Sequence, residues 1–236
     1  MNTIKKQTKT NVFFSVSYKH DVDVFFNLIK DRHKNHEKII TDIYSKAKIF
    51  FNKDNNSISK KYIIDFVKLE YSLQQKKIEK NVRTIEKAWQ KVEEDFFLNC
   101  TKIFKNYNNG LVTRYYKAYP SIWAKYIRNT KDKSVTFPYD KGVDDALFVI
   151  SHEILHIIFY NYLYSKYPVL RRQISSQRVY DSSEVINVIL QNNAIFIKIF
   201  HLKAKAYPEH KELYRRVKKL WQEKKDIDFV IKNILL

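Results

Sequence analysis

Residues 149–158 read Val-Ile-Ser-His-Glu-Ile-Leu-His-Ile-Ile, with two histidines four residues apart and a glutamate directly after the first. In an α-helix, residues at i and i+4 lie on one face, so His152 and His156 are predicted to project side by side. Two such imidazoles can bind one zinc ion, and Glu153 beside them can take a proton from metal-bound water. No Gly or Pro interrupts the segment and its flanks are uncharged. The pattern predicts a metal-binding helix with Glu153 as general base and acid.

This segment resembles the active-site helix of the zincin metallopeptidases. It does not continue as a metzincin does, because Ile157-Ile-Phe-Tyr-Asn-Tyr follows His156 where a glycine and a third histidine would stand. It looks instead like a gluzincin, in which a glutamate on a second helix is the third zinc ligand. The resemblance covers residues 140–190 and implies peptide-bond hydrolysis with one Zn²⁺ ion. It also implies that the strand Ser134–Tyr139 lines the cleft and binds the substrate backbone as an added β-strand.

Glu184 matches the third ligand of this pattern. It stands in Ser-Ser-Glu-Val-Ile-Asn-Val-Ile-Leu, far enough beyond His156 for one helix to end and a second to pack beside it. The segment resembles the glutamate helix of gluzincins, whose familiar members carry an aspartate at the position of Val188 to orient a ligand histidine. Asn187 or Asp181 is therefore expected to orient the ligand here.

Two other interpretations of these residues remain open. Asp181 and Glu184 have the spacing of a capping box, in which Glu184 would serve the start of its own helix. His201 is a second candidate for the third metal ligand, because a histidine on a helix can also coordinate the ion.

Hydrolysis also needs a hydrogen-bond donor for the developing oxyanion, often Tyr, His or Arg in this superfamily. The chain has 17 tyrosines, so the sequence does not single one out. The candidates are Tyr180, Tyr207 and His210, each with a structural role as the alternative. Three arginines in the link between the two ligand helices could bind a substrate carboxylate or belong to a solvated loop: Arg171, Arg172 and Arg178.

Composition favours a mostly helical intracellular protein. Of the 236 residues, 44% are hydrophobic and 15% aromatic, which excludes a mainly disordered chain. Only 2 Gly and 4 Pro occur, so sandwiches, propellers and Gly-rich nucleotide loops are not expected. The one cysteine, Cys100, excludes an internal disulfide framework and a Cys-rich zinc cluster.

The net charge of +19 suggests weak polyanion binding through a basic surface. Lys supplies most of this charge, and it lacks the planar donor fork with which Arg recognises phosphates and bases. Over residues 141–190 five basic and five acidic side chains cancel, so the charge lies outside the predicted catalytic region. The most apolar stretch, Ala146 to Tyr164, contains His152, Glu153 and His156. We therefore expect no membrane span and a cytoplasmic location.

Periodicity predicts the order of elements along the chain. The expected elements are a strand at 12–18, a helix from Asp21 to about Phe51, one or two helices over 60–105 with Ser59 as cap, a strand at Ser134–Tyr139 ending near Pro138, a helix from Asp144 or Asp145 to about Lys166, a helix from near Asp181 past Phe200, and a last helix from Tyr207-Pro208. In the long segment the apolar series runs from Leu69 and Leu73 to Phe104. The run NYNNG at 106–110 is the expected boundary between two parts.

The predicted fold is α+β and mainly helical. Residues 1–110 form a helical N-terminal part, either a scaffold or an inhibitory pro-segment. Residues 111–236 form a zincin-like metallopeptidase domain with a short mixed sheet and an active-site helix, which acts on a peptide or protein substrate. Two other functions stay open: a catalytically inactive zincin-like scaffold or regulator, and a basic helical nucleic-acid-binding protein.

Overall fold

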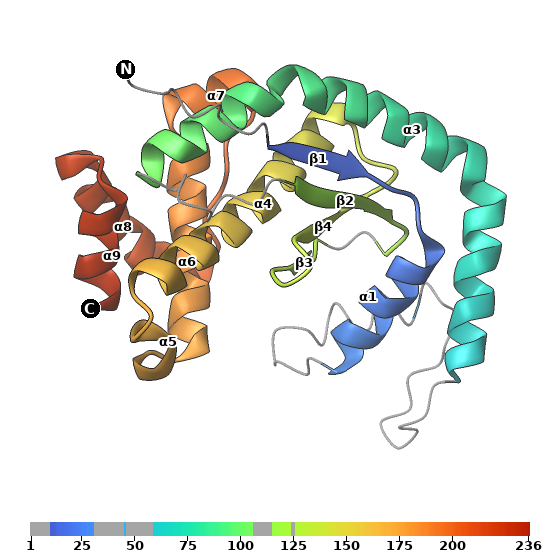
Figure 1. The fold of residues 1–236 in the computed structure, drawn as a ribbon, viewed down its shortest axis with the longest axis horizontal. Coiled ribbons are helices and arrows are strands. Elements are labelled where there is room, and N and C mark those ends of the chain that lie inside the picture. Colours follow the sequence, from blue (N-terminus) through green and yellow to red (C-terminus); the bar gives the residue numbers. More distant parts are fainter. Residues whose placement is uncertain (1–9, 31–44, 46–58, 106–114, 124–125) are drawn as a thin grey trace, which may run out of the picture.

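The computed structural model describes residues 10–30, 45, 59–105, 115–123 and 126–236 (Figure 1). Its strands are β1 (Asn11–Phe14), β2 (Tyr115–Ser121), β3 (Arg128–Asn129) and β4 (Ser134–Pro138). Its helices are α1 (Tyr18–Lys30), α3 (Lys60–Ile103), α4 (Val143–Lys166), α5 (Leu170–Gln173), α6 (Ser176–Gln191), α7 (Ala194–Phe200), α8 (Lys211–Lys224) and α9 (Ile227–Leu235), with a 3-10 turn at Pro208–His210. The predicted α+β, mainly helical class is confirmed.

The small sheet is mixed, with the strand order β1-β2-β4-β3. β1 and β2 pair in parallel, as do β2 and β4, whereas β3 runs antiparallel to β4. In the β3–β4 turn, Asn129 Oδ1 accepts hydrogen bonds from the backbone N–H groups of Lys131 and Asp132, both at 3.0 Å. Pro138 ends β4, as predicted. β4 lies between β2 and β3, and β3 pairs with Ser134 and Val135 in its first half. The expectation that Ser134–Tyr139 binds the substrate backbone as an added β-strand stays a prediction.

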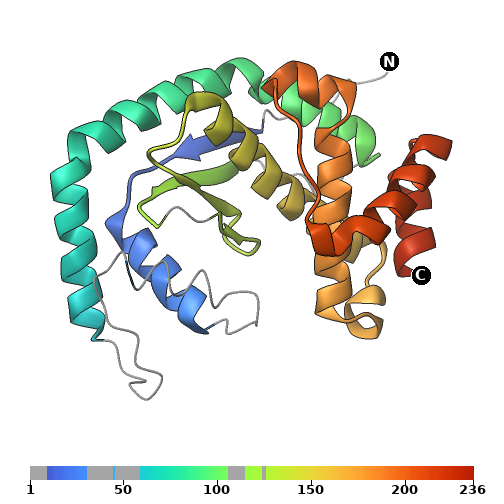
Figure 2. The ribbon, with the colours of Figure 1, turned by 180° about the vertical axis from the view of Figure 1, so that it is seen from behind.

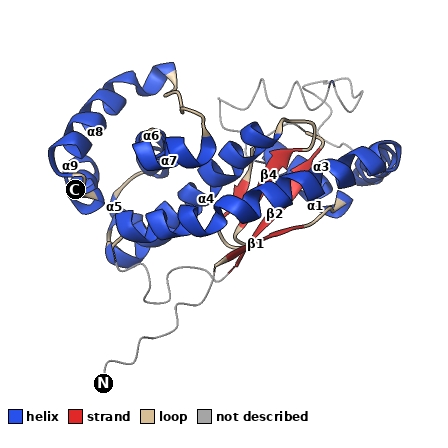
Figure 3. Cartoon of the chain, turned by 90° about the horizontal axis from the view of Figure 1, so that it is seen from above, coloured by secondary structure: helices blue, strands red, loops and turns tan. Residues whose placement is uncertain are grey.

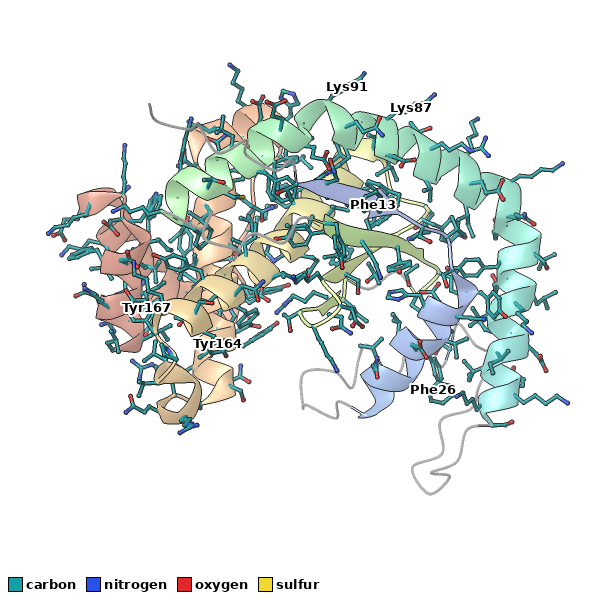
Figure 4. The ribbon with its side chains drawn as sticks, viewed as in Figure 1. Phe13, Phe26, Lys87, Lys91, Tyr164 and Tyr167 are labelled. Carbon is teal, nitrogen blue, oxygen red and sulfur yellow. The ribbon has the colours of Figure 1, made fainter. Side chains whose placement is uncertain are left out.

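One continuous helix, α3, covers the predicted region 60–105 and curves around the sheet and α1 (Figure 1). Ser59 caps it as predicted, accepting a hydrogen bond from the backbone of Tyr62. Leu69 and Leu73 are 56% and 67% exposed, so their place in the predicted core is wrong. The first half of α3 buries the face that carries Ile63, which packs towards α1, and the two leucines lie on a different face. Lys87 and Lys91 project outward from the same helix (Figure 4).

α4 is the central helix, and it packs against β3, β4, α3 and α6. The main core contains side chains from both sides of residue 110, among them Trp89, Phe96, Ile154 and Ile158. Residues 106–114 around the predicted boundary lie outside the described part. By length and composition α4 could cross a membrane, and 72% of its most apolar window is buried inside the protein. A core helix of a water-soluble protein has the same properties.

The helix starts differ from those predicted. α4 begins after Gly142 with no side-chain cap, and Asp144 and Asp145 lie in its first turn, where a negative charge favours the helix N-terminus. α6 begins five residues before Asp181, because Ser175 caps it by accepting from the backbone N–H of Arg178. Asp181 is therefore interior to α6, which removes the capping-box interpretation of Glu184.

The last third of the chain folds into a group of helices at one side of the sheet (Figure 3). The predicted single helix past Phe200 is two, because Asn193 caps a new helix, α7, after α6 ends. The 3-10 turn at Pro208 leads into α8, close to the predicted start of the last helix. α9 was not predicted; it follows Lys225, which adopts a left-handed conformation with φ of 49°. The predicted helix from Asp21 is α1, and its expected continuation to Phe51 falls largely outside the described residues.

Candidate metal centre

Two packed helices, α4 and α6, bring together the residues that the sequence singles out (Figure 2). α4 carries His152, Glu153 and His156, and α6 carries Glu184. Glu153, His156 and Glu184 are buried, and the side chain of His152 is 19% exposed. The i, i+4 spacing within α4 directs both imidazoles towards α6.

The nitrogen and oxygen atoms of three side chains converge at one point. His152 Nε2 and His156 Nε2 are 3.0 Å apart. Glu184 Oε1 lies 3.2 Å from His156 Nε2, and Glu184 Oε2 lies 3.4 Å from His152 Nε2. Donor atoms bound at about 2.0–2.1 Å to one tetrahedral ion lie about 3.3 Å apart. All three separations are close to this edge length, and the two contacts of Glu184 involve its two different oxygens.

The other nitrogen of each imidazole has its own partner. His152 Nδ1 lies 2.7 Å from Gln191 Oε1, and His156 Nδ1 lies 2.5 Å from Ser183 Oγ. The Gln191 amide nitrogen donates to Phe148 O and Ser151 Oγ, so its oxygen faces His152 and can only accept. His152 Nδ1 must then carry a proton, which leaves the Nε2 lone pair of the neutral ring directed at the centre.

This arrangement fits a bound cation. The two Nε2 atoms face each other, and two neutral imidazoles with both lone pairs at that point would repel unless a proton or a metal ion lay between them. Glu184 Oε2 is buried, and in the described part of the chain its contact to His152 Nε2, at 3.4 Å, does not have the geometry of a full hydrogen bond. Two imidazoles and a carboxylate are the donor set that Zn²⁺ takes in catalytic sites. His152, His156 and Glu184 could therefore hold zinc.

Glu153 is the other acid near the two histidines. It offers a ligand atom within 4.8 Å of theirs, so distance alone would also admit it as a ligand. Its Oε2, however, accepts a hydrogen bond at 3.0 Å from Nη1 of Arg128. Glu184 contacts both imidazoles more closely, so it is the better candidate for a third ligand.

Arg128, on β3, was not predicted as a site residue. Its Nη2 also lies 3.8 Å from Glu184 Oε1, and its guanidinium lies over the rings of Tyr160 and Tyr180. No periodicity marks a two-residue strand, so its pairing with β4 could not be foreseen from the sequence.

The charges of the site shift the pKa values of its groups in opposite directions. Burial, reinforced by Arg128, lowers the pKa of His156 to about 4. Burial also opposes the charged form of His152, but hydrogen bonding to Glu184 and the nearby charge of Glu153 outweigh it and raise the pKa. Burial works against ionisation of Glu153 as well, yet Arg128 and the two histidines lower its pKa. Both imidazole rings can therefore be neutral near pH 7 when a metal ion displaces the extra proton of His152.

The residues expected to orient the ligands contact other groups. Asn187 donates to the backbone oxygen of His152 at 3.1 Å, not to its ring. Asp181 accepts from Gln177 and lies 3.2 Å from His210 Nε2. The contacts to the ring nitrogens come from Ser183 and Gln191 instead. The position of Gln191 could be predicted from the sequence, since it follows Glu184 by seven residues and lies on the same helix face.

The other candidates lie at different distances from the centre. Tyr180 and Tyr207 are near it: burial first and then the charge of Glu184 raise the pKa of each hydroxyl. His210 packs edge-to-face on Tyr207.

His201, the second candidate for the third ligand, is exposed at the C-terminal end of α7, whereas Glu184 contacts His152 and His156. Arg178 donates to the backbone oxygen of Ile234, and Arg172 is exposed; the side chain of Arg171 lies outside the described part.

No protein-family model, no curated protein and no solved structure is significantly similar to this chain. The function of the chain is therefore inferred from the geometry of the centre.

Proposed function

We propose that the protein is a zinc-dependent metallopeptidase with a zincin-like catalytic part of the gluzincin kind. In this proposal His152, His156 and Glu184 hold one zinc ion, and Glu153 is the general base. The single observation that carries it is the convergence of two Nε2 atoms and one carboxylate at tetrahedral separations of 3.0–3.4 Å. Zinc bound there would act as a Lewis acid and make a water molecule nucleophilic at neutral pH.

The chain's own groups supply the other requirements of hydrolysis. Ser183 and Gln191 hold each histidine in the orientation that leaves Nε2 free. Glu153 follows His152 directly on α4 and is ionised at neutral pH, so it can accept a proton at a carboxylate oxygen. The apolar surroundings of α4 exclude bulk water, which strengthens the interactions within the site.

Tyr180 and Tyr207 are the proposed donors to the developing oxyanion. Both hydroxyls have raised pKa values, so they remain protonated and can donate at neutral pH. His210 is held between Tyr207 and Asp181 and completes this side of the site. A Phe substitution at whichever tyrosine donates should lower kcat about 10²–10³-fold and leave zinc content unchanged.

Peptide hydrolysis tests the proposal directly. The zinc-loaded wild type should cleave members of a random peptide library, and chelation should abolish cleavage. Glu153→Gln should retain zinc but lose at least about 10²-fold in turnover, because it removes the proton acceptor and not a ligand. The exposed His201→Ala serves as the control for loss of a histidine. A zinc-loaded wild type that cleaves no peptide would contradict the enzyme assignment and favour a binding or regulatory role.

A further inference from the structure

The guanidinium of Arg128 lies inside the candidate metal centre. Its side chain is 17% exposed, and it forms ion pairs with Glu153 at 3.0 Å and with Glu184 at 3.8 Å. The β3–β4 hairpin determines this position, since Arg128 pairs in register with Val135 in the inner strand. Among the described lysines and arginines, only Arg128 lies within ion-pair distance of either glutamate. A molecule that enters the site would therefore contact this cation.

Two aromatic rings confine the guanidinium without using its donors. Its Cζ lies 5.7 Å from the ring centroid of Tyr160 and 5.8 Å from that of Tyr180. Such cation–π contacts restrict the guanidinium without using its N–H donors. A guanidinium has five N–H donors, and in the described part of the chain one of them donates a hydrogen bond, to Glu153. Arg128 is therefore mostly buried with unused hydrogen-bonding capacity.

A carboxylate is the partner that this group fits best. The planar fork of a guanidinium matches a carboxylate through two parallel N–H···O bonds. The present contact to Glu153 uses one of these, and the distance to Glu184 Oε1 is too long for a hydrogen bond. A neutral or cationic substrate would leave Arg128 bound to Oε2 of Glu153, the proposed base.

We infer that Arg128 is a specificity-determining residue that binds a carboxylate of the substrate next to the cleaved bond, in exchange for its bond to Glu153. The exchange replaces one carboxylate by another, so the charge beside Arg128 is conserved and Glu153 is released only when an acidic substrate is bound. The carboxylate can come from two sources, the free C-terminus of a peptide or an Asp or Glu side chain. This inference rests on the proposed peptidase function.

A matched peptide series distinguishes the two sources. Each peptide that the wild type cleaves is compared with its C-terminal amide and with a form in which Asp and Glu become Asn and Gln. The wild type should lose about 10- to 100-fold in kcat/KM when the recognised carboxylate is removed, as expected for a hydrogen-bonded charge. Loss with the amide identifies the C-terminus, and loss with Asn or Gln identifies a side chain. Equal cleavage of all three forms would overturn the inference.

Arg128→Gln should abolish this preference, giving equal kcat/KM for the charged and uncharged peptides, while Arg128→Lys should keep part of it. Lys131→Gln removes the same charge from the exposed turn of the same hairpin and should keep the full preference. Zinc content should match wild type in all three variants, which also shows that each has folded. An unchanged preference in Arg128→Gln would overturn the inference.

Binding measured by calorimetry gives a readout that does not depend on turnover. The same peptides, or a short acidic peptide with its amidated and its Asn/Gln forms if none is cleaved, are titrated into zinc-loaded Glu153→Gln protein, in which the competing carboxylate is absent. The acidic peptide should bind at least about tenfold more tightly than its uncharged form, and the added substitution Arg128→Gln should remove the difference. If the protein binds zinc but cleaves nothing, the proposed function fails, while this titration still decides whether Arg128 binds a carboxylate.

Discussion

Ser183 and Gln191 determine which nitrogen of each histidine is available to a metal. Their contacts to Nδ1, at 2.5 and 2.7 Å, keep the Nε2 atoms directed at Glu184. Without them each ring could turn or change tautomer, and the three donor atoms would no longer be held at tetrahedral separations.

Ser183→Ala should therefore weaken zinc binding about 10- to 100-fold, the usual cost of losing the partner of a ligand histidine. Ser182→Ala is the matched control, since Ser182 is the neighbouring serine on α6 and is equally buried, at 1% against 0%. Competition with a chromophoric chelator measures both affinities. Equal affinity in the two variants would show that Ser183 does not orient His156.

Lowering the pH should weaken metal binding because a single group, His152, becomes protonated. His152 has a raised pKa and His156 a pKa of about 4, so between pH 5 and the ordinary histidine value of 6.5 only His152 takes up a proton. Because a protonated imidazole cannot coordinate, zinc affinity should fall about tenfold per pH unit as pH decreases over this range. Isothermal titration at several pH values measures the slope. A flat profile, or about a hundredfold change per unit, would contradict the assignment of these protonation states.

Sequence spacing could predict which histidines and glutamate of α4 lie together, but not their neighbours. His152, Glu153 and His156 are adjacent on one helix, so the i, i+4 rule is enough to place them together. Glu184 needed a family resemblance, because its approach depends on how α6 packs on α4. Arg128 reaches the centre because β3 pairs with β4, and nothing local in the sequence marks such a contact.

At the scale of elements, Glu93 joins the sheet to the long helix. From within α3 it accepts a hydrogen bond from the backbone N–H of Val12 in β1 at 2.6 Å and another from Trp89 Nε1 at 3.0 Å. The side chain is buried, so both donors depend on it. This contact helps to hold β1 against α3 and, through β2, the sheet that positions α4.

Glu93→Ala should lower the free energy of unfolding by about 2–4 kcal/mol, because it leaves two buried donors without a partner. Glu94→Ala, at the next and exposed position, should change it by less than about 0.5 kcal/mol. Urea-induced unfolding followed by circular dichroism measures both. A Glu93→Ala protein as stable as Glu94→Ala would show that the buried acceptor is dispensable.

Long periodic elements could be predicted, whereas the start of α6 and the two-residue strand β3 could not. The core stripe of α3 and the apolar surroundings of α4 gave their extent to within a few residues. The start of α6 was misplaced because Ser175 caps it ahead of a polar first turn, where no apolar pattern begins. Leu69 and Leu73 follow the helical period, but tertiary packing buries a different face of that half of α3.

At the scale of the whole molecule, the net charge of +19 lies mainly outside the candidate centre. Exposed basic residues form a row along α3, at Lys76, Lys80, Arg83, Lys87 and Lys91, and a group on α8, at Arg215, Arg216, Lys218 and Lys219. Neither group touches the metal ligands. A basic surface of this kind can bind polyanions without any part in catalysis.

We expect weak retention on immobilised heparin at about 50 mM salt that is lost well below 1 M, since counterion release dominates such binding. Replacing Arg215, Arg216, Lys218 and Lys219 of α8 by Gln should lower the eluting salt concentration, whereas chelation of zinc should not change it. Retention that depends on zinc, or that persists at about 1 M salt, would contradict a purely electrostatic surface.

The central claim is that one metal ion joins α4 to α6 through His152, His156 and Glu184. Elemental analysis of purified wild type, His156→Ala, Glu184→Ala and His201→Ala tests it most directly. The account predicts about one zinc per chain in wild type and His201→Ala, none in His156→Ala and weakened binding in Glu184→Ala. Wild-type protein that stays free of metal after zinc is supplied would contradict the account.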